Sequence, residues 1–187
     1  GPLDLAIGER GLERDLGERR RDRRESARRV VHDAVESALF GEDPLDRLAE
    51  SLPFDFILGS LHDVDGIDVS GPKASEFFRG RPLEAAYGRY FEALHELVNW
   101  GGFDAVAHFD LVKRYGHKAY GEFEPSSLEA PIRSVLAGMG RAGIGMEVNT
   151  SGCAQWPRAP YPDESILTWA REEGVPFLTL GSDSHAP

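Results

Sequence analysis

Cysteine is almost absent from this chain of 187 residues, because Cys153 is the only one. One cysteine cannot form a disulfide within the chain, and a reducing compartment fits such a composition. Long apolar runs are also missing, so no segment of the sequence is suited to span a bilayer. We therefore expect a soluble, cytoplasmic protein with no membrane partner.

Positive charge is scarce as well. The chain has 21 Lys and Arg residues against 32 Asp and Glu residues, which gives a formal net charge of -11. Nucleic acids and anionic lipids are polyanions, so this balance argues against non-specific binding to either. A small phosphorylated substrate remains compatible, because one cationic pocket can lie on an acidic surface. The composition does not indicate an oligomeric state.

The first 42 residues differ in texture from the rest. Between Arg10 and Arg29 charges of both signs are dense and apolar residues are few. This composition is typical of a solvated helix or a partly disordered segment. A nucleic-acid-binding arm is the alternative, but the acidic residues cancel most of the charge and no aromatic residues are interleaved.

From residue 43 to residue 187 the pattern alternates between short apolar runs and amphipathic stretches. The runs predict strands at 54–59, 103–107, 144–149 and 176–180, and the stretches predict helices at 45–52, 83–99, 131–142 and 163–173. Gly143 and Gly174 stand where the last two helices should end. Strands and helices in alternation indicate an α/β domain with a parallel sheet, either open or closed into a barrel.

Polar residues with metal-binding chemistry follow three of these strands: His62, His108, Asp183 and His185. The carboxyl ends of parallel strands lie at one face, where sites are built. A single histidine at a strand end is more often a hydrogen-bonded structural residue. Several such segments in succession favour a site for Zn²⁺, Fe²⁺ or Mn²⁺.

The other histidines have weaker claims on such a site. His95 lies within an expected helix and is interpreted as a packing or surface residue. His117, in a glycine-rich stretch, and His32, in the charged segment, are interpreted as solvated.

Four stretches resemble the polymerase-and-histidinol-phosphatase (PHP) family, and most of all its histidinol-phosphatase branch. Residues 53–62 resemble the family's strand that leads to a ligand histidine, and residues 103–111 resemble its next ligand-bearing segment. Residues 147–152, Glu-Val-Asn-Thr-Ser-Gly, are similar to a stretch typical of the histidinol-phosphatase branch. Residues 180–185 resemble its Gly-Ser-Asp-x-His motif. The resemblance therefore covers residues 43–187.

The resemblance implies a distorted (β/α)7 barrel that holds up to three divalent transition metals, Zn, Mn or Fe. The implied reaction is hydrolysis of L-histidinol phosphate to L-histidinol and phosphate, in histidine biosynthesis, with water activated by metal. His62, His108, Asp183 and His185 match ligand positions, and we expect Asp183 and His185 to be catalytic as well. Arg158 is the candidate that binds the phosphate, with a surface arginine as the alternative.

The sequence also departs from the family pattern, because it contains no His-x-His, which supplies two ligands at the start of the family's barrel. Glu36 is the best match for a further carboxylate ligand and Glu9 is its rival, although either could be a surface residue. We therefore expect a barrel that lacks its first βα units and its C-terminal tail. Two alternatives to histidinol phosphate hydrolysis stay open: action on another phosphate ester, and a non-catalytic remnant that binds metal.

Overall fold

The computed structural model describes residues 34–36, for which only the backbone is considered, and residues 54–184. The chain divides into two compact units, one of residues 1–32 and 43–56 and the other of residues 33–42 and 57–187. Nearly all of the first unit lies outside the described residues, as do the helix expected at 45–52 and His32. The domain boundary expected after residue 42 therefore stays a prediction.

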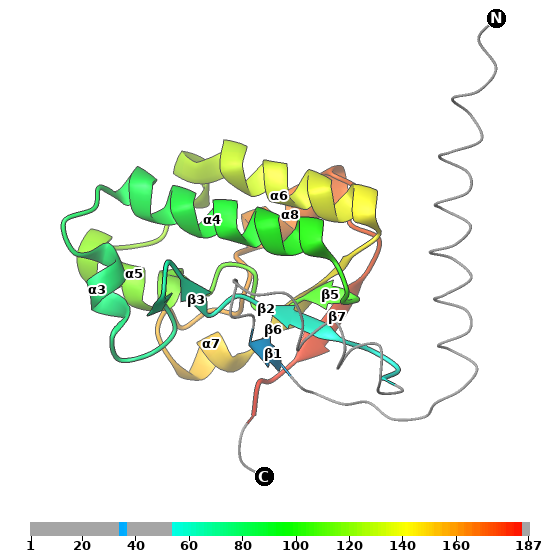
Figure 1. Ribbon diagram of the computed structural model, residues 1–187, viewed down its shortest axis with the longest axis horizontal. Helices are drawn as coiled ribbons and strands as arrows, with labels where there is room; N and C mark the ends of the chain where they lie inside the picture. Colours follow the sequence, from blue (N-terminus) through cyan, green and yellow to red (C-terminus); the bar gives the residue numbers. More distant parts are fainter. Residues whose placement is uncertain (1–33, 37–53, 185–187) are drawn as a thin grey trace, which may run out of the picture. The chain divides into compact units, whose positions relative to one another are not determined.

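The second unit is built on a sheet of 5 strands in the order β1-β2-β5-β6-β7 (Figure 1). Every neighbouring pair in this sheet is parallel, as the sequence predicted. The strands are β1 (Ala34–Glu36), β2 (Leu58–Ser60), β5 (Ala105–Val106), β6 (Gly145–Asn149) and β7 (Leu178–Gly181). Among the described strands, β1 and β7 stand at the two ends of this order, and no pairing between them closes a barrel.

All four predicted strands are shorter in the structure than the apolar runs that predicted them, and β2 and β5 lose the most residues. The strand expected at 54–59 is regular only from Leu58 to Ser60. The backbone N–H of Ile57 donates to the side chain of Asp104 over 2.9 Å instead of to a backbone carbonyl, while the carbonyl of Ile57 accepts from the N–H of Asp104 over 2.9 Å. The strand expected at 103–107 is regular only from Ala105 to Val106, as β5.

The helices predicted at 83–99, 131–142 and 163–173 are confirmed as α4 (Leu83–Trp100), α6 (Glu129–Ala142) and α8 (Glu164–Glu172). The remaining helices are α3 (Ala74–Phe78), α5 (Lys113–Tyr120), the 3₁₀ turn η1 (Pro125–Leu128) and α7 (Ser151–Ala154). Strands β3 (Asp63–Val64) and β4 (Ile67–Asp68) form a separate hairpin. No helix in the described part of the chain has the length and apolarity needed to cross a membrane.

Local sequence explains where α8 begins and ends. The side chain of Asp163 accepts a hydrogen bond from the backbone N–H of Ser165 over 2.9 Å, which satisfies one of the free donors of the first turn. At the other end Gly174 adopts a φ of 78°, and the N–H of Val175 reaches back to the carbonyl of Ala170. This is a Schellman ending, in which a residue without a side chain takes the left-handed position.

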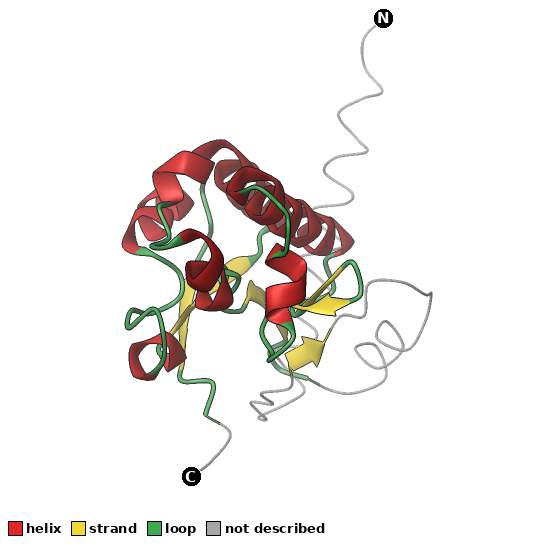
Figure 2. Cartoon of the chain, turned by 90° about the vertical axis from the view of Figure 1, so that its left-hand side faces the viewer, coloured by secondary structure: helices red, strands yellow, loops and turns green. Residues whose placement is uncertain are grey.

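The helices lie around the sheet, and α6 packs between α4 and α8. Figure 1 shows α4 and α6 side by side over the strands, with α3 and α5 together at one end, and Figure 2 shows the same helices outside the strands from a second direction. The buried side of α4 presents Tyr87, Tyr90, Phe91, Leu94 and Leu97 to this core. These positions follow the helical spacing that predicted the helix.

Helix α6 lies very close to the C-terminal end of α8 at Gly140. A Cβ atom at this position would collide with the backbone carbonyl oxygen of Glu173. Arg133 of α6 strengthens the contact, because its guanidinium donates to Glu172 over 2.6 Å and to Glu173 over 2.8 Å. A side chain at position 140 could be accommodated only if one backbone moved.

We expect Gly140→Ala to lower the free energy of unfolding by about 1–3 kcal/mol, because overpacking against a backbone atom cannot be relieved by a change of rotamer. Gly88→Ala is the matched control, since a Cβ at this α4 position meets nothing within 4 Å. It should raise the free energy of unfolding by about 0.5–1 kcal/mol through helix propensity. Urea unfolding measures both, and an equal effect of the two substitutions would contradict the close contact.

Candidate metal centre

Two of the predicted ligands, His62 and His108, lie against each other. Their ring centroids are 5.0 Å apart and the rings are almost perpendicular, at 89°. Each histidine comes two residues after the end of a strand, His62 after β2 and His108 after β5. Since β2 and β5 are parallel neighbours, their carboxyl ends bring the two rings together. The sequence predicted this meeting.

The orientation of His62 is fixed by a short relay of hydrogen bonds. Its Nδ1 lies 2.8 Å from the hydroxyl of Ser70, and that hydroxyl donates to Asp68 over 2.6 Å. Burial opposes ionisation of Asp68, but hydrogen bonds from Ser70 hold the pKa of this carboxyl below its ordinary value. Ser70 has one hydroxyl proton and gives it to Asp68, so it must accept the Nδ1–H of His62. The Nε2 lone pair of His62 is thereby left for a ligand bond.

His108 is buried, with 4% of its surface exposed. Its Nδ1 has no hydrogen-bond partner among the described residues. Burial, reinforced by the neighbouring His62, lowers the pKa of His108 to about 3, so its ring is neutral. A neutral imidazole with a buried, unpartnered nitrogen beside a second imidazole suits a divalent transition metal, and the pair therefore fits such an ion.

A buried carboxylate holds the backbone of His108 in place. Glu147, in β6, is 2% exposed and accepts from the backbone N–H of His108 over 3.1 Å. The same oxygen accepts from the side-chain amide of Asn149 over 2.9 Å. The other oxygen packs so tightly against Gly181 that a Cβ there would collide with it. The stretch 147–152 thus positions both His108 and the start of the segment that carries Asp183, a role that its family resemblance did not reveal.

The structure describes only some of the remaining predicted ligands. Asp183 is exposed and has a φ of 50°, and its charge contributes to raising the pKa of the buried Tyr161, after burial itself and Asp110. The backbone of Glu36 is opposite Ser60 at the carboxyl end of β1, and its side chain is outside the description. His185 and Glu9 lie outside the described residues. Within residues 54–184 no group of three or more metal-binding side chains comes together.

The loop that carries Arg158 is anchored at both ends. Arg158 is exposed, has a φ of 67° and donates its N–H to the carbonyl of Gln155 over 2.8 Å. Downstream, Tyr161 exchanges two backbone hydrogen bonds with Asn149, of 2.7 and 2.9 Å. Upstream, the ring of Trp156 lies 4.3 Å from that of His117. The loop is therefore held beside the carboxyl end of β6.

His117 corrects one interpretation. It was expected to be solvated in a glycine-rich loop, but it lies in α5 and is half-buried. Its Nδ1 donates to the carbonyl of Arg114 over 2.7 Å, while its ring packs on Trp156. The expectation was wrong because packing of α5 on the core outweighs the weak helix propensity of Gly116. His95 lies within α4 as expected, 3.4 Å from Asn99.

A buried ion pair lies directly beyond His108. The ammonium of Lys113 is 2.7 Å from Asp110, and both side chains are almost completely shielded from solvent. Asp110 also accepts from the N–H of Asp163 over 2.9 Å, and Lys113 donates to the carbonyl of Pro160 over 3.1 Å. This pair ties the start of α5 to the Arg158 loop and to the first turn of α8.

Sequence reasoning missed one cation in this region. The charge of Arg114, next to Lys113, acts on His108 and lowers the pKa of Tyr161 against the stronger effect of burial. Arg114 stands four residues after Asp110, the last residue of the strand-end His-x-Asp stretch, and this position was the available signal.

Comparisons with known proteins agree with the family resemblance, although no family model matches the chain. The chain is 29% identical over 144 residues to a Deinococcus radiodurans protein named "Probable histidinol-phosphatase". It is 26% identical over 142 residues to a Lactococcus lactis protein named "Histidinol-phosphatase". These matches cover 76% and 75% of this chain but 52% of each relative, so the chain spans about half the length of these curated relatives.

Solved structures show the same fold. A histidinol phosphate phosphatase from Lactococcus lactis, in a complex with Zn, L-histidinol and phosphate, superposes with a TM-score of 0.71 at 21% identity, covering 92% of this chain and 65% of that one. A structure from Listeria monocytogenes gives a TM-score of 0.69 at 22% identity, covering 81% and 62%. The curated relatives confirm the sequence resemblance to histidinol-phosphatases, and the solved structures share the α/β fold with its parallel sheet.

The Ser70 relay predicts a loss of metal affinity when it is broken. Ser70→Ala removes the acceptor that orients the Nδ1–H of His62, and we expect Zn²⁺ affinity to fall by about 10- to 100-fold. Ser126→Ala, at an exposed position, is the control and should leave affinity unchanged. Competition of the protein with a Zn²⁺ indicator measures both. Equal affinities of the two variants would show that Ser70 does not orient a ligand.

The lowered pKa of His108 predicts how the free energy of unfolding of the metal-free protein changes with pH. The pKa of His108 is about 3 in the folded chain, against an ordinary value of 6.5. The unfolded chain therefore binds a proton at a higher pH than the folded chain does, so the free energy of unfolding is highest above pH 6.5 and falls as the pH is lowered toward 3. The loss should reach about 2 kcal/mol at about pH 5.

His108→Gln removes this titration. Urea unfolding in the presence of a chelator should give a smaller loss of stability on acidification for the variant than for the parent chain. Parallel pH profiles for the two proteins would contradict the lowered pKa. If the variant does not fold, His62→Gln serves instead, because it removes one of the causes of the lowered pKa.

Proposed function

We propose that this chain belongs to a metal-dependent phosphatase that hydrolyses L-histidinol phosphate to L-histidinol and phosphate, in histidine biosynthesis. The observation that carries the proposal is the pair of perpendicular imidazoles of His62 and His108 at the carboxyl ends of adjacent parallel strands. Similarity to proteins named histidinol-phosphatase supports the substrate. A cytoplasmic location is part of the proposal and fits the single cysteine.

The proposed metal ligands are His62, His108, Asp183 and His185, with Glu36 as a further carboxylate. Zn, Mn or Fe suits this set of nitrogen and oxygen donors, with up to three ions. Bound metal would neutralise phosphate charge and activate water for attack. The Zn in the similar Lactococcus lactis structure supports a divalent ion.

The chain's own residues have distinct roles in this proposal. Glu147 and the Ser70–Asp68 relay hold the two histidines in their ligand orientations. Asp183 and His185, which are two residues apart in the sequence, orient the attacking water, and the carboxylate of Asp183 accepts its proton. Arg158 binds the phosphate through its guanidinium, and Arg114 adds positive charge from the start of α5.

The parallel strands β1, β2, β5, β6 and β7 would form part of a distorted (β/α)7 barrel. Their common direction supports this arrangement, since it gathers the candidate ligands at one end. Position 36 is in register with Ser60, two residues before His62, which supports Glu36 over Glu9 as the additional ligand.

A second candidate function is a metal-binding remnant without catalysis. The absence of a His-x-His from the sequence favours it, because two ligands of the family's site are then missing. Action on a different phosphate ester is also open on the same metal chemistry, and the stretch 147–152 favours histidinol phosphate instead.

One experiment separates these functions. The purified chain is analysed for transition metals, and phosphate release from L-histidinol phosphate is measured on the same sample with added Mn²⁺ or Zn²⁺. We expect bound metal and turnover, and we expect His108→Ala and Asp183→Ala to lose metal and to lower kcat by about 100-fold or more. His95→Ala, a half-exposed position on α4, should change neither quantity.

Each other outcome has a definite meaning. Metal without turnover would establish the remnant, and turnover of other phosphate esters in preference to histidinol phosphate would establish a different substrate. Unchanged metal content in His108→Ala would overturn the ligand assignment.

A further inference from the structure

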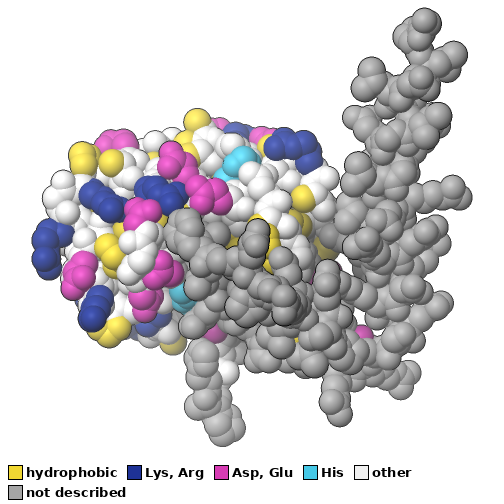
Figure 3. Space-filling model, viewed as in Figure 1, with side chains coloured by type: hydrophobic (Ala, Val, Ile, Leu, Met, Phe, Trp, Pro, Cys, Tyr) yellow, Lys and Arg dark blue, Asp and Glu magenta, His cyan; other side chains and the backbone are white. Residues whose placement is uncertain are grey.

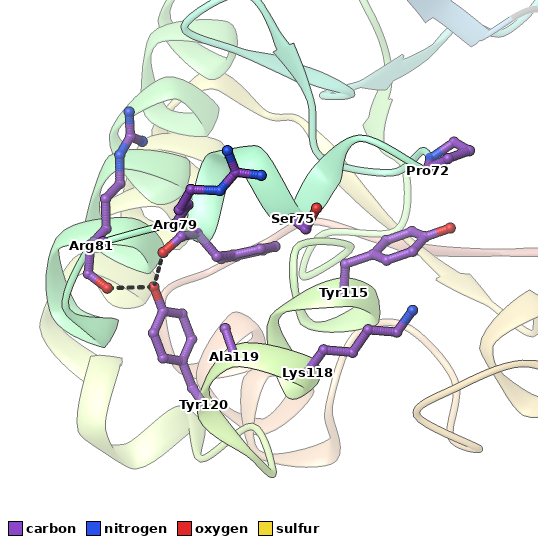
Figure 4. A pocket seen from close by; sticks show the side chains of 10 residues that line it. Pro72, Ser75, Arg79, Arg81, Tyr115, Lys118, Ala119 and Tyr120 are labelled. Carbon is purple, nitrogen blue, oxygen red and sulfur yellow. Dashed lines mark hydrogen bonds between the residues drawn. The ribbon is translucent and has the colours of Figure 1, made fainter.

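A cavity of about 510 Å³ lies between α3 and α5. Its walls include Pro72, Ser75 and Arg79 on one side and Tyr115, Lys118 and Tyr120 on the other (Figure 4). Small-molecule sites typically enclose about 300–1,000 Å³, so a compact organic ligand fits this volume. Neither His62 nor His108 contributes to the walls.

The cavity is cationic on an acidic protein. Arg79, Arg81 and Lys118 line it, and none of its lining residues is acidic. The whole chain has a formal net charge of -11, so a cavity whose charged lining residues are all basic differs from the average of the chain. Figure 3 shows acidic and basic side chains intermixed over the end of the molecule where α3 and α5 lie, which makes this one-sign lining a local feature.

Two of the three cations are available to a ligand. Arg81 is paired with Asp65 over 3.5 Å and covers the ring of Phe77, and Figure 4 shows its guanidinium turned away from the space between α3 and α5. Arg79 and Lys118 have no carboxylate within ion-pairing distance among the described residues. Arg79 lines the cavity from the end of α3 and Lys118 lines it from α5, where the Lys118 ammonium extends on the same side as the Tyr115 hydroxyl (Figure 4).

The walls are rigid and aromatic. The hydroxyl of Tyr120 donates to the carbonyl of Arg81 over 2.8 Å and lies 3.4 Å from that of Phe78, so it joins α5 to the end of α3. The ring of Tyr115 lies beneath the Lys118 ammonium at 5.1 Å. An aromatic wall beside two unpaired cations suits a ligand with an anionic group and a flat apolar body.

We propose that this pocket binds a small organic phosphate that carries a ring, with the phosphate between Arg79 and Lys118 and the ring against Tyr115. The site is separate from the metal centre and does not rest on the proposed function. It is joined to that centre through the chain, because Pro72 of the wall follows Ser70 of the His62 relay by two residues.

The test uses phenyl phosphate as the probe, with the whole chain in a chelator so that no metal is present to hydrolyse it. Calorimetry should give one saturable site, and amide NMR shifts should move at Ser75, Lys118 and Ala119. Arg79→Gln and Lys118→Gln should each weaken binding by about tenfold or more, because each removes a charged hydrogen-bond donor to phosphate. Inorganic phosphate should bind more weakly than phenyl phosphate, since it lacks the ring.

Two control variants locate the probe. Arg141→Gln removes an exposed arginine of α6 that does not line the pocket, and His62→Gln alters the histidine pair. Both should bind phenyl phosphate as the parent chain does. The proposal is overturned if no saturable binding occurs, if Arg79→Gln and Lys118→Gln leave affinity unchanged, or if His62→Gln alone abolishes binding.

Discussion

The described part of the molecule depends on one buried carboxylate, that of Glu147. A carboxylate removed from water needs hydrogen-bond donors, and one oxygen of Glu147 receives two, the backbone N–H of His108 and the side-chain amide of Asn149. Its other oxygen sits against Gly181 at the end of β7. Three neighbouring strand ends are thus fixed by one side chain, and the ring of His108 is presented to His62 as a result.

A second buried charge acts on the loops above that sheet edge. Lys113 neutralises Asp110 and contacts the carbonyl of Pro160, and Asp110 also receives the N–H of Asp163. Removing one partner of such a pair leaves an uncompensated charge in the interior. Two polar clusters therefore hold the candidate residues: Glu147 contacts the backbone of His108, and the Asp110–Lys113 pair contacts the loop that carries Arg158.

Those parts of the fold that depend on local sequence could be predicted. Helix α8 has a capping aspartate and a terminal glycine, and α4 has a continuous apolar stripe. Each helix can therefore be predicted from its own sequence without knowledge of tertiary contacts. The meeting of His62 with His108 also follows from sequence, because parallel strands place their carboxyl ends together. The roles of individual ligands remain predictions.

The rest depends on contacts that sequence does not display. Strand β1 has three residues where no strand was predicted, and it is defined by its pairing with β2. The hairpin β3–β4 was signalled by Asp65-Gly66, a common two-residue turn, and that signal was overlooked. Neither the unpaired nitrogen of His108 nor the cationic lining between α3 and α5 can be recognised without coordinates, since each is defined by what surrounds it.

The contact at Gly140 sets a limit on how this sequence can drift. Side chains that touch side chains can be exchanged gradually, with each substitution compensated by a neighbour. At Gly140 the neighbour is the carbonyl of Glu173, which every residue carries, so no substitution at position 173 makes room for a larger residue at position 140. Arg133 and its three carboxylate partners are free to be replaced by other pairs. During evolution the charged residues on the surface of α6 and α8 can therefore be substituted, while Gly140 must stay a glycine.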